Sequence, residues 1–556
     1  MRQSNLNLLL KKGIITKEQI ERAQEECRNK GVTLEKALER LGFISEIDIA
    51  AAIAESIGVP FMDLSDYLVD PEVIKLIPEN IAKRYKIVPL FKIGDTLTVA
   101  MEDPQNITAI DEIRKKSNVG AIDTVLSTPE MIQKVIDQYY SVMGNVEELM
   151  KDLSKEELEE RQKNIGGLAE IAEDAPVIKL VNLLIMQAVK DKASDIHVEP
   201  QQDRLLVRYR IDGVLYEAHS IPKHLQSALA SRIKVMAKMD ISETRKPQDG
   251  RIQLRMEGRS LDLRISSFPT IYGENIVARI LDKSSVLLGL AELGLSDDNL
   301  KDFEKIIHRP NGIALVTGPT GSGKTTTLYA ALSVISSIDK NIITIEDPVE
   351  YELSLIRQTQ INPKADLTFA SGLKSILRQD PDIIMVGEIR DRETADIAIR
   401  ASLTGHLVFS TLHTNDAASA LTRLIDMGIE PFLVATSVIA ILAQRLVRVN
   451  CSNCKEKYTL SEKILKDLKI TDKIDFYRGK GCKHCKKTGF LGRIGIYELL
   501  IINEEIREMI MAKVSAGEIK KKALSFGMST LFSDGLRKAK EGMTTIEEVL
   551  RVTESV

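Results

Sequence analysis

Apolar residues in the C-terminal half of this chain form short uninterrupted runs that alternate with helical spacings. Runs rich in β-branched residues predict buried strands at 313–317, 341–345, 383–386 and 408–412. Residues 325–335, which follow a Gly-rich loop, have the spacing of a helix. This order of strand, loop, helix and strand predicts an α/β layered domain with a largely parallel sheet, spanning residues 289–556.

The segment 175–288 has a different pattern, that of a helix followed by antiparallel hairpins. Residues 178–191 predict the helix. Two pairs of strand-like runs come after it, each joined by a turn that contains glycine: 205–211 with 213–216, and 251–255 with 261–265. We therefore expect a separate α+β domain before the parallel sheet.

A smaller α/β domain is expected at 61–143. Its predicted elements are strands at 87–91 and 96–100 around the Gly94-Asp95 turn, and helices at 108–116 and 129–139. Residues 144–174 are highly charged and carry few large apolar residues, which is typical of a linker. Our hypothesis is that the N-terminal domains move relative to the domains on the C-terminal side of this linker.

Residues 1–60 contain a repeat with a displacement of 29 positions. In each copy a helical pattern ends at a glycine, Gly13 or Gly42, and a hydroxyl residue, Thr16 or Ser45, opens the next helix as its N-cap. The repeat predicts a small helical domain of two similar units.

Composition excludes some classes of function. The 556 residues carry a formal net charge of -4 and no Trp, so neither a global basic field nor aromatic stacking favours nucleic acid as a partner. The longest apolar stretch, 432–443, is shorter than the roughly 18–20 residues of a membrane-spanning helix, and we interpret it as a buried helix. We find no signal peptide and expect a cytosolic protein that reaches a membrane only through a partner.

A phosphate-binding loop is the strongest chemical signal. It follows the strand 313–317 and precedes the helix 325–335, the context that such a loop requires. Lys324 is expected to contact the outer phosphates of ATP, and the Thr325 hydroxyl to hold Mg²⁺. The predicted nucleotide contacts of this segment are Gly318, Pro319, Thr320, Gly321, Ser322, Gly323, Lys324, Thr325 and Thr326.

Acidic residues follow two of the other predicted strands, where a parallel sheet delivers side chains to its ligand. Glu388 is our candidate for activating the attacking water. The supporting carboxylates are Glu346, Asp347 and Glu350. Each acid has an alternative as a solvated loop charge, and for Glu350 the two interpretations are equally good.

Two histidines, His406 and His413, bracket the strand 408–412. A single histidine is more often structural than catalytic. As a pair beside a nucleotide they are candidates for sensing the γ-phosphate or for relaying between sites.

Four of the five cysteines form two Cys-x-x-Cys pairs: Cys451 with Cys454, and Cys482 with Cys485. Four thiolates suit a closed, structural Zn²⁺ site, while a redox pair is the alternative. His484 lies inside the second pair, where it is a poor substitute ligand. Cys27 is interpreted as an incidental thiol.

Several segments together resemble the secretion ATPase superfamily, in the branch of type II secretion ATPases and type IV pilus assembly ATPases. They are 193–200, 208–213, 247–251, 345–351, 377–382, 404–415, 444–448 and the tetracysteine element. The resemblance implies a RecA-like ATPase core, a PAS-like α+β domain before it, and a homohexamer. It also implies that Arg264 and Arg279 reach a neighbouring subunit's nucleotide, and that Arg445 contacts phosphate.

The N-terminal repeat resembles a module that binds cyclic di-GMP in some members of that family. Those members begin each copy with Arg-Leu-Gly, and residues 4–6 and 33–35 lack the arginine and the glycine here. The departure puts cyclic di-GMP binding in doubt and favours docking to a membrane platform.

The function that this resemblance implies is a hexameric cytoplasmic motor, which hydrolyses ATP to drive pseudopilus assembly in type II secretion. Residues 371–377, 401–404 and 426–432 are more similar to the type II form than to the pilus form. Type IV pilus extension is the alternative. A nucleic-acid translocase and a regulator that binds ATP without hydrolysing it are less favoured. The implied partners are an inner-membrane platform and cytoplasmic docking proteins.

Overall fold

The computed structural model describes residues 9–10, 14–30, 34–65, 67–140, 175–282, 288–460 and 475–553. The chain forms two compact units, Met1–Ser284 and Ser285–Val556. The predicted linker at 144–174 lies outside the described residues, as do residues 4–6 and 33 of the N-terminal repeat.

The first unit begins with the helices α2 (Lys17–Lys30), α3 (Leu34–Arg40) and α4 (Glu46–Ile57). Thr16 and Gln19 exchange two hydrogen bonds, of 2.8 and 3.3 Å, at the start of α2. Ser45 and Asp48 form the matching capping box at the start of α4. The predicted N-caps are therefore confirmed in both copies. Cys27 lies on α2, partly buried against the core of this helical group.

A three-stranded sheet comes next, with the order β2-β3-β4. Its strands are β2 (Ile87–Ile93), β3 (Thr96–Met101) and β4 (Ala121–Leu126), and its helices are α5 (Pro71–Ile74), α6 (Glu79–Tyr85), α7 (Ile107–Ser117) and α8 (Pro129–Tyr140). The β2–β3 pair is antiparallel and β3–β4 is parallel. The predicted hairpin and both predicted helices are confirmed.

The rest of the first unit is a seven-stranded sheet in the order β1-β8-β9-β10-β5-β6-β7. Its elements are β1 (Tyr67–Leu68), α12 (Ala175–Lys190), β5 (Ala193–Pro200), β6 (Arg204–Ile211), β7 (Val214–Pro222), η1 (Lys223–Leu225), α13 (Gln226–Met236), β8 (Gln248–Met256), β9 (Arg259–Thr270) and β10 (Gly273–Asp282). Both predicted hairpins, β6–β7 and β8–β9, are present and antiparallel.

The small α/β domain and this larger sheet share one hydrophobic core, which includes Ile87 of β2 and Leu263 of β9. β1 extends the sheet by pairing in parallel with β8, and the Tyr67 hydroxyl accepts a hydrogen bond from the Gly258 amide at 3.2 Å. The small α/β domain therefore packs against the α+β domain within the first unit.

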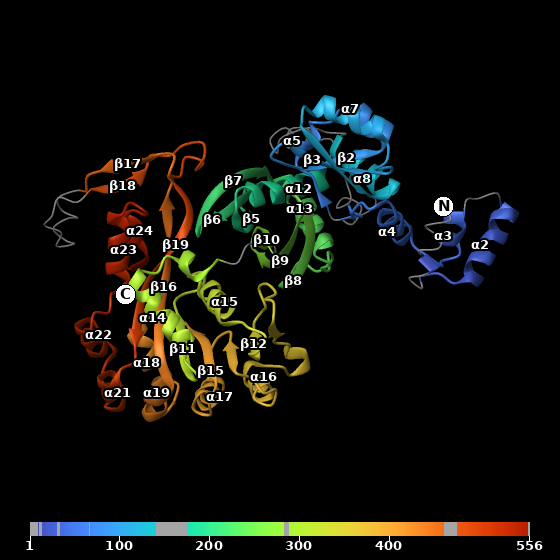
Figure 1. Ribbon diagram of the computed structural model, residues 1–556. Coiled ribbons are helices and arrows are strands. Elements are labelled where there is room, and N and C mark those ends of the chain that lie inside the picture. Colours follow the sequence, from blue (N-terminus) through green and yellow to red (C-terminus); the bar gives the residue numbers. More distant parts are fainter. Residues whose placement is uncertain are drawn as a thin grey trace. The chain divides into compact units, whose positions relative to one another are not determined.

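The second unit contains another seven-stranded sheet, in the order β13-β12-β14-β15-β11-β16-β19 (Figure 1). All neighbouring strands are parallel except β16 and β19. The strands are β11 (Gly312–Thr317), β12 (Ile342–Glu346), β13 (Ile356–Gln360), β14 (Ile383–Val386), β15 (Leu407–Leu412), β16 (Val438–Asn450) and β19 (Phe490–Ile501). The predicted parallel-rich sheet is thereby confirmed.

Helices on the two sides of this sheet bury separate apolar clusters. The helices described in this unit are η2 (Leu290–Leu293), α14 (Asp297–Ile307), α15 (Lys324–Ile335), η3 (Pro363–Ala365), α16 (Phe369–Ile376), α17 (Arg392–Leu403), α18 (Ala417–Asp426), α19 (Pro431–Ser437), α21 (Glu504–Met511), α22 (Ala516–Ser525), α23 (Leu531–Lys540) and α24 (Ile546–Thr553). A two-stranded hairpin, β17 (Lys455–Tyr458) with β18 (Phe476–Gly479), carries the cysteine region.

We predicted one buried helix for the apolar stretch 432–443, and this prediction is wrong. Helix α19 ends at Ser437, and β16 starts at Val438 between β11 and β19. A strand in this position is buried on both faces, so its apolar run does not alternate and resembles a buried helix in the sequence.

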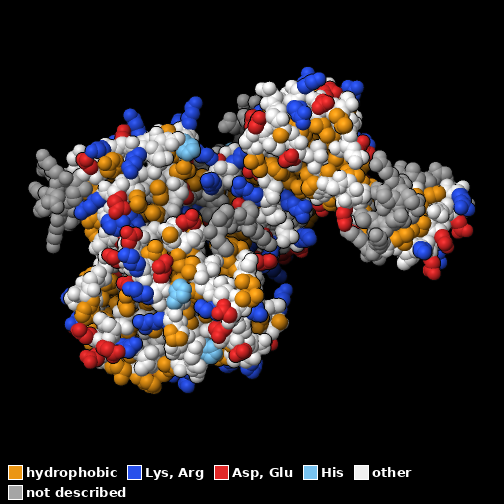
Figure 2. All heavy atoms as spheres, in the orientation of Figure 1, with side chains coloured by type: hydrophobic (Ala, Val, Ile, Leu, Met, Phe, Trp, Pro, Cys, Tyr) orange, Lys and Arg blue, Asp and Glu red, His pale blue; other side chains and the backbone are white. Residues whose placement is uncertain are grey.

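On the face shown in Figure 2, basic and acidic side chains are interspersed over both units. Among the helices that the structure describes, none combines the length and the apolar character needed to span a membrane.

Candidate nucleotide site and tetracysteine cluster

The Gly-rich loop joins the C-terminal end of β11 to the first residue of α15, Lys324. Gly321 and Gly323 have φ of 79° and 87°, values that L side chains rarely adopt. A Cβ on Gly318 would lie 2.6 Å from both the Gln444 carbonyl oxygen and Ser322 Oγ. The loop therefore requires glycine for its shape, and Pro319, Thr320 and Gly321 form its exposed crest.

Two further features of this loop fit a bound phosphate. Ser322 Oγ is buried and has no hydrogen-bond partner in the described chain. The amides of Thr325 and Thr326 belong to the first turn of α15, where helix N–H groups lack an intrahelical acceptor. These donors, together with the positive end of the helix, form the kind of site that binds an anionic phosphate.

Gln444 of β16 braces the loop, and sequence reasoning did not assign it a role. Its Nε2 donates to the Ser322 carbonyl at 2.6 Å, and its Oε1 accepts from Thr327 Oγ1 at 2.8 Å. The side chain is 1% exposed. The sequence places Gln444 only within a family segment, because no local pattern shows that β16 lies next to β11.

Lys324 turns its ammonium group back onto its own loop. Nζ donates to the carbonyls of Gly318 at 2.8 Å and of Pro319 at 3.1 Å. Burial lowers the pKa of Lys324 to about 8, while the charge of Glu388 raises it and that of Arg445 lowers it further. The loop follows β11 and Glu388 follows β14, and both strands run parallel to β15, so the lysine and the candidate water-activating acid lie at the same edge of the sheet.

Glu388 lies two residues beyond the end of β14, and the structure brings one predicted and one unpredicted partner to it. His413 Nε2, just beyond β15, lies 3.2 Å from Glu388 Oε2. Arg390 forms an ion pair with Glu388 and lies 3.9 Å from Asp347. Arg390 was missed because its sequence context resembles an ordinary loop charge.

The structure separates His406 from this group, which corrects our prediction that both histidines serve the nucleotide. His406 precedes β15, and its Nδ1 lies 2.8 Å from the Ala401 carbonyl oxygen. His413 follows the same strand, and six residues of strand span roughly 20 Å. His406 is therefore at the opposite edge of the sheet from the loop.

Glu346 is 2% exposed and accepts three hydrogen bonds from protein side chains. Its carboxylate accepts hydrogen bonds from the Tyr329 hydroxyl at 2.5 Å, from Thr344 Oγ1 at 2.5 Å and from Gln358 Nε2 at 3.2 Å. Both oxygens of the carboxylate thus accept protein hydrogen bonds, which join β12 to Tyr329 of α15 and to Gln358 of β13.

Glu350 is half-buried and contacts the same tyrosine, Tyr329, that donates to Glu346. Its backbone amide donates to the Tyr329 hydroxyl at 3.4 Å. Burial is the main cause that raises the pKa of Tyr351, and a hydrogen bond from Thr326 opposes it. Thr326, Tyr351 and Tyr329 therefore connect the segment of Glu350 to the start of α15.

Arg445 is 5% exposed on β16, and Nη2 donates to Asn415 Oδ1 at 3.0 Å. Burial lowers the pKa of its guanidinium, while the charges of Asp416 and Glu498 raise it. Arg445 is next to Gln444 in the chain and influences Lys324 electrostatically.

Arg264 and Arg279 belong to the first unit, whereas the loop belongs to the second. They are directly opposed on β9 and β10. Arg279 Nε donates to Asp195 Oδ1 at 3.0 Å, and its side chain is 59% exposed.

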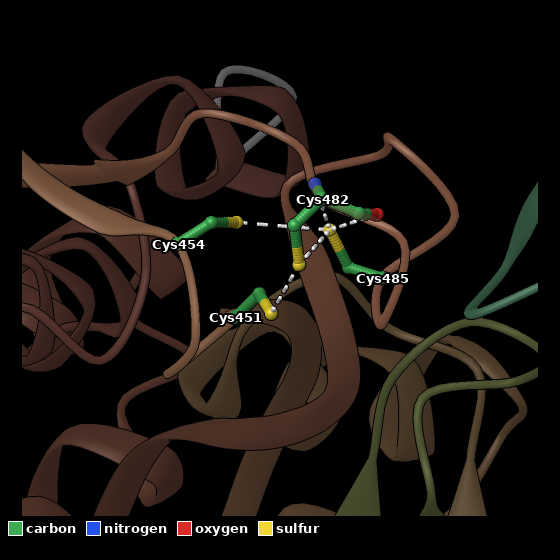
Figure 3. Close-up of side chains that lie close together, drawn as sticks. All are labelled: Cys451, Cys454, Cys482 and Cys485. Carbon is green, nitrogen blue, oxygen red and sulfur yellow. Dashed lines mark hydrogen bonds between the residues drawn. The ribbon is translucent and has the colours of Figure 1, made fainter.

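The four predicted cysteines converge from two loops of the second unit, with their sulfur atoms directed toward one another (Figure 3). All four sulfur atoms lie within 4.8 Å of one another. Neighbouring sulfur atoms are 3.7 to 3.9 Å apart. A tetrahedron with Zn–S bonds of about 2.3 Å has edges of about 3.8 Å, so the residues fit zinc. His484 is not among the converging ligands.

Backbone amides support these sulfur atoms. Those of Gly481 and Cys482 point to Cys454 and Cys485 at 3.3 and 3.1 Å. Amide donors stabilise thiolate charge, as metal ligation requires.

Comparison with known proteins adds a family model and close relatives. Residues 170–551 match the model described as Type II/IV secretion system protein, and residues 57–146 match the MshEN domain. The chain is 46% identical over 552 residues to the type IV pilus assembly ATPase PilB of Myxococcus xanthus (strain DK1622), covering 98% of this chain and 97% of the relative.

A second relative is the type II secretion system protein E of Xanthomonas campestris pv. campestris, which is 45% identical over 549 residues, with 96% and 95% coverage. The X-ray structure of the Yersinia pseudotuberculosis ATPase DotB is similar over 68% of this chain and 94% of that chain, with 23% identity and a TM-score of 0.52. A structural match at this identity supports the fold alone.

Proposed function

We propose, from the premise that this chain belongs to the type II/IV secretion system protein family, that it is the ATP-hydrolysing motor that drives pseudopilus assembly in type II secretion. Family membership bears out the predicted resemblance and the predicted ATP hydrolase. The observation that carries the proposal is the placement of Lys324 and Glu388 at the carboxyl edge of one parallel sheet, where Lys324 follows β11, Glu388 follows β14, and β15 lies between the two strands.

ATP is proposed to bind with its phosphates in the loop 318–325. Lys324 Nζ would leave the loop carbonyls to contact the outer phosphates, while the α15 amides stabilise their charge. Thr325 Oγ1 would hold Mg²⁺, which supplies neutralising charge when bound. Glu388 is proposed to orient the attacking water and accept its proton, with His413 and Arg390 holding the carboxylate.

Glu350 and Asp347 are proposed as supporting acids beside Glu388. Asp347 lies 3.9 Å from Arg390, which also pairs with Glu388. The backbone amide of Glu350 donates to the hydroxyl of Tyr329 on α15, which holds this residue near the helix that follows the loop.

The motor is proposed to be a homohexamer in which Arg264 and Arg279 reach the nucleotide of a neighbouring subunit. An arginine supplied in trans stabilises the charge of a phosphoryl-transfer transition state. Both arginines belong to the first unit, and the loop belongs to the second. Arg445 is proposed to contribute positive charge from the β16 side of the loop.

The test of this assignment is steady-state phosphate release by the purified hexamer. Lys324→Ala and Glu388→Gln should each lower turnover by at least a hundredfold, as measured for groups that act on the transition state. Lys305→Ala and Glu393→Gln are matched controls, because both side chains form exposed surface ion pairs. Wild-type turnover in Lys324→Ala or Glu388→Gln would contradict the site.

Mixing variants tests the shared site. Arg279→Ala subunits retain an intact loop, and Lys324→Ala subunits retain intact arginines. Mixed hexamers should therefore recover activity at the interfaces where an intact arginine meets an intact loop. No recovery after verified subunit exchange would contradict a contribution in trans.

The type IV pilus assembly ATPase is the second candidate, favoured by the 46% identity to PilB over 98% of the chain. Deletion in the bacterium of origin distinguishes the two, because it should abolish either exoprotein secretion or surface pili.

The proposed location is the cytoplasm, peripheral to the inner membrane through a platform protein and cytoplasmic docking proteins. The N-terminal repeat is proposed as a docking module in place of a cyclic di-GMP site. A nucleic-acid translocase would instead show DNA-stimulated turnover with steep salt dependence.

The tetracysteine cluster is proposed to hold one structural Zn²⁺. The ligands are Cys451, Cys454, Cys482 and Cys485, and all four positions of a tetrahedral ion would be filled. The ion would join the loops that flank the β17–β18 hairpin.

A further inference from the structure

Five charged residues occupy one row across five adjacent strands of the first unit's sheet. In the register of the sheet, each of these residues lies directly opposite the next one in the row. In strand order the row is Arg251, Arg264, Arg279, Asp195 and Arg210. Directly opposed residues of antiparallel strands lie on the same face of a sheet. The five side chains therefore share one face.

That face is the polar side of the sheet. The residues that alternate with the row, such as Ile265 of β9, Ala278 of β10 and Ile196 of β5, are buried in the hydrophobic core. Arginines opposed to one another repel, and Arg251, Arg264 and Arg279 are consecutive in the row. The row thus holds an excess of positive charge, with Asp195 as its one carboxylate.

Asp195 is 6% exposed, and three neighbouring side chains contact its carboxylate. Its Oδ2 accepts a hydrogen bond from Ser194 Oγ at 2.7 Å and lies 3.6 Å from Arg210 Nε. Its Oδ1 accepts from Arg279 Nε at 3.0 Å. Arg210 is fixed separately, because its Nη1 donates to the Gly213 carbonyl at 3.0 Å.

The contact between Asp195 and Arg279 uses one nitrogen of the guanidinium. Among the residues that the structure describes, Asp195 alone hydrogen-bonds Arg279, and it does so through Nε. Within the described part of the chain, the terminal nitrogens Nη1 and Nη2 have no hydrogen-bond acceptor, and the side chain is 59% exposed. A guanidinium anchored at Nε presents two parallel N–H groups, the geometry that binds phosphate oxygens.

We propose that Asp195 is a positioning residue for ATP hydrolysis, which aims the Arg279 guanidinium at the nucleotide of the neighbouring subunit. The inference rests on the proposed role of Arg279 in trans. Anchoring Nε restricts the rotamers of a long side chain before the nucleotide arrives, so the arginine is already oriented when transition-state charge develops.

A purely structural ion pair is the competing explanation, and the neighbouring strands β5 and β6 provide its control. Glu199 of β5 accepts from Arg208 Nη2 of β6 at 2.6 Å. This pair is also partly buried, and no role in the nucleotide site is proposed for it. Glu199→Gln therefore reports what the loss of an ion pair on these strands does by itself.

The experiment measures kcat and KM for ATP in full-length hexamers of Asp195→Asn, Arg279→Ala, the double variant and Glu199→Gln. We expect Asp195→Asn to lower kcat on the order of tenfold with KM within about twofold, because misplacing a catalytic group affects the transition state. Glu199→Gln should leave kcat unchanged. In the double variant, kcat should equal that of Arg279→Ala, since Asp195 acts through Arg279.

Wild-type kcat in Asp195→Asn, or a double variant slower than Arg279→Ala, would overturn the positioning role. Normal turnover in Arg279→Ala would contradict the proposed trans arginine instead, so the two failures are distinguishable. If Asp195→Asn does not assemble, Ser194→Ala decides, because it removes the hydroxyl that orients Oδ2. It should lower kcat in the wild-type background and have no effect with Arg279→Ala. Unchanged kcat in Ser194→Ala would then overturn the proposal.

Discussion

His413 Nε2 lies 3.2 Å from Glu388 Oε2, at the carboxyl ends of the neighbouring strands β15 and β14. We expect His413→Ala to lower kcat for ATP hydrolysis on the order of tenfold, since a hydrogen bond to a charged group contributes roughly 1.5–3 kcal/mol. KM for ATP should change little, because His413 orients the carboxylate and Lys324 binds the phosphates. Steady-state kinetics of the hexamer measure both constants.

His406→Ala is the matched control for this variant. The His406 ring contacts the Ala401 carbonyl at the other end of β15, so its loss should leave kcat near the wild-type value. Equal losses in the two variants would show that the observed separation of the histidines has no bearing on catalysis.

Gln444 links the phosphate-binding loop to α15 through two buried hydrogen bonds, of 2.6 and 2.8 Å. Gln444→Ala would leave the Ser322 carbonyl and the Thr327 hydroxyl without these partners. We expect the free energy of unfolding to fall by about 2–4 kcal/mol and KM for ATP to rise. Thermal unfolding and ATPase kinetics measure the two effects.

A graded variant checks the cause of these effects. Thr327→Val removes one of the two bonds and leaves the contact with Ser322 intact. It should lower stability by less than Gln444→Ala and leave KM near the wild-type value. A larger effect of Thr327→Val would show that the loop contact is not what matters.

The pKa of Lys324, which burial lowers to about 8, predicts a pH dependence of nucleotide binding. As pH rises above about 8, the empty site loses the ammonium charge that attracts phosphate. The affinity for ATP should therefore weaken, by up to about tenfold per pH unit. Binding at a pH just above this pKa should also take up a proton, because phosphate raises the pKa of the lysine. Calorimetry in buffers of different ionisation enthalpy measures this uptake.

Lys324→Arg is the control, since a guanidinium stays charged throughout this range. Its ATP affinity, measured with a fluorescent nucleotide, should not change between about pH 7.5 and about pH 9.5. A wild-type affinity that is equally independent of pH would contradict the lowered pKa.

Zinc content tests the tetracysteine cluster. The purified chain should contain about one zinc per chain, and the double variant Cys451→Ser, Cys482→Ser should contain close to none. Structural zinc stabilises small elements strongly, so the region around β17 and β18 should become sensitive to protease. Elemental analysis and limited proteolysis report these outcomes.

Cys27→Ser serves as the thiol control. Cys27 lies on α2 in the other compact unit, so its loss should leave zinc content unchanged. Zinc retained at one equivalent in the double cysteine variant would contradict the proposed ligand set.

The sequence by itself determined the elements whose signals are local. The strand β11, the Gly-rich loop and helix α15 are contiguous, so their order predicts a phosphate site without any distant contact. Thr16 and Ser45 cap their helices through residues three positions away. The paired cysteine spacing likewise predicted which four thiols converge.

Only the tertiary structure decided which side chains from distant strands meet. Gln444 contacts Ser322 because β16 lies next to β11, and Asp195 contacts Arg279 because β5 pairs with β10. The order of strands in a sheet depends on the packing of whole elements, which no local pattern encodes. The separation of His406 from His413 has a different cause, because they stand at the two ends of the single strand β15, and the length of that strand alone places them at opposite edges of the sheet.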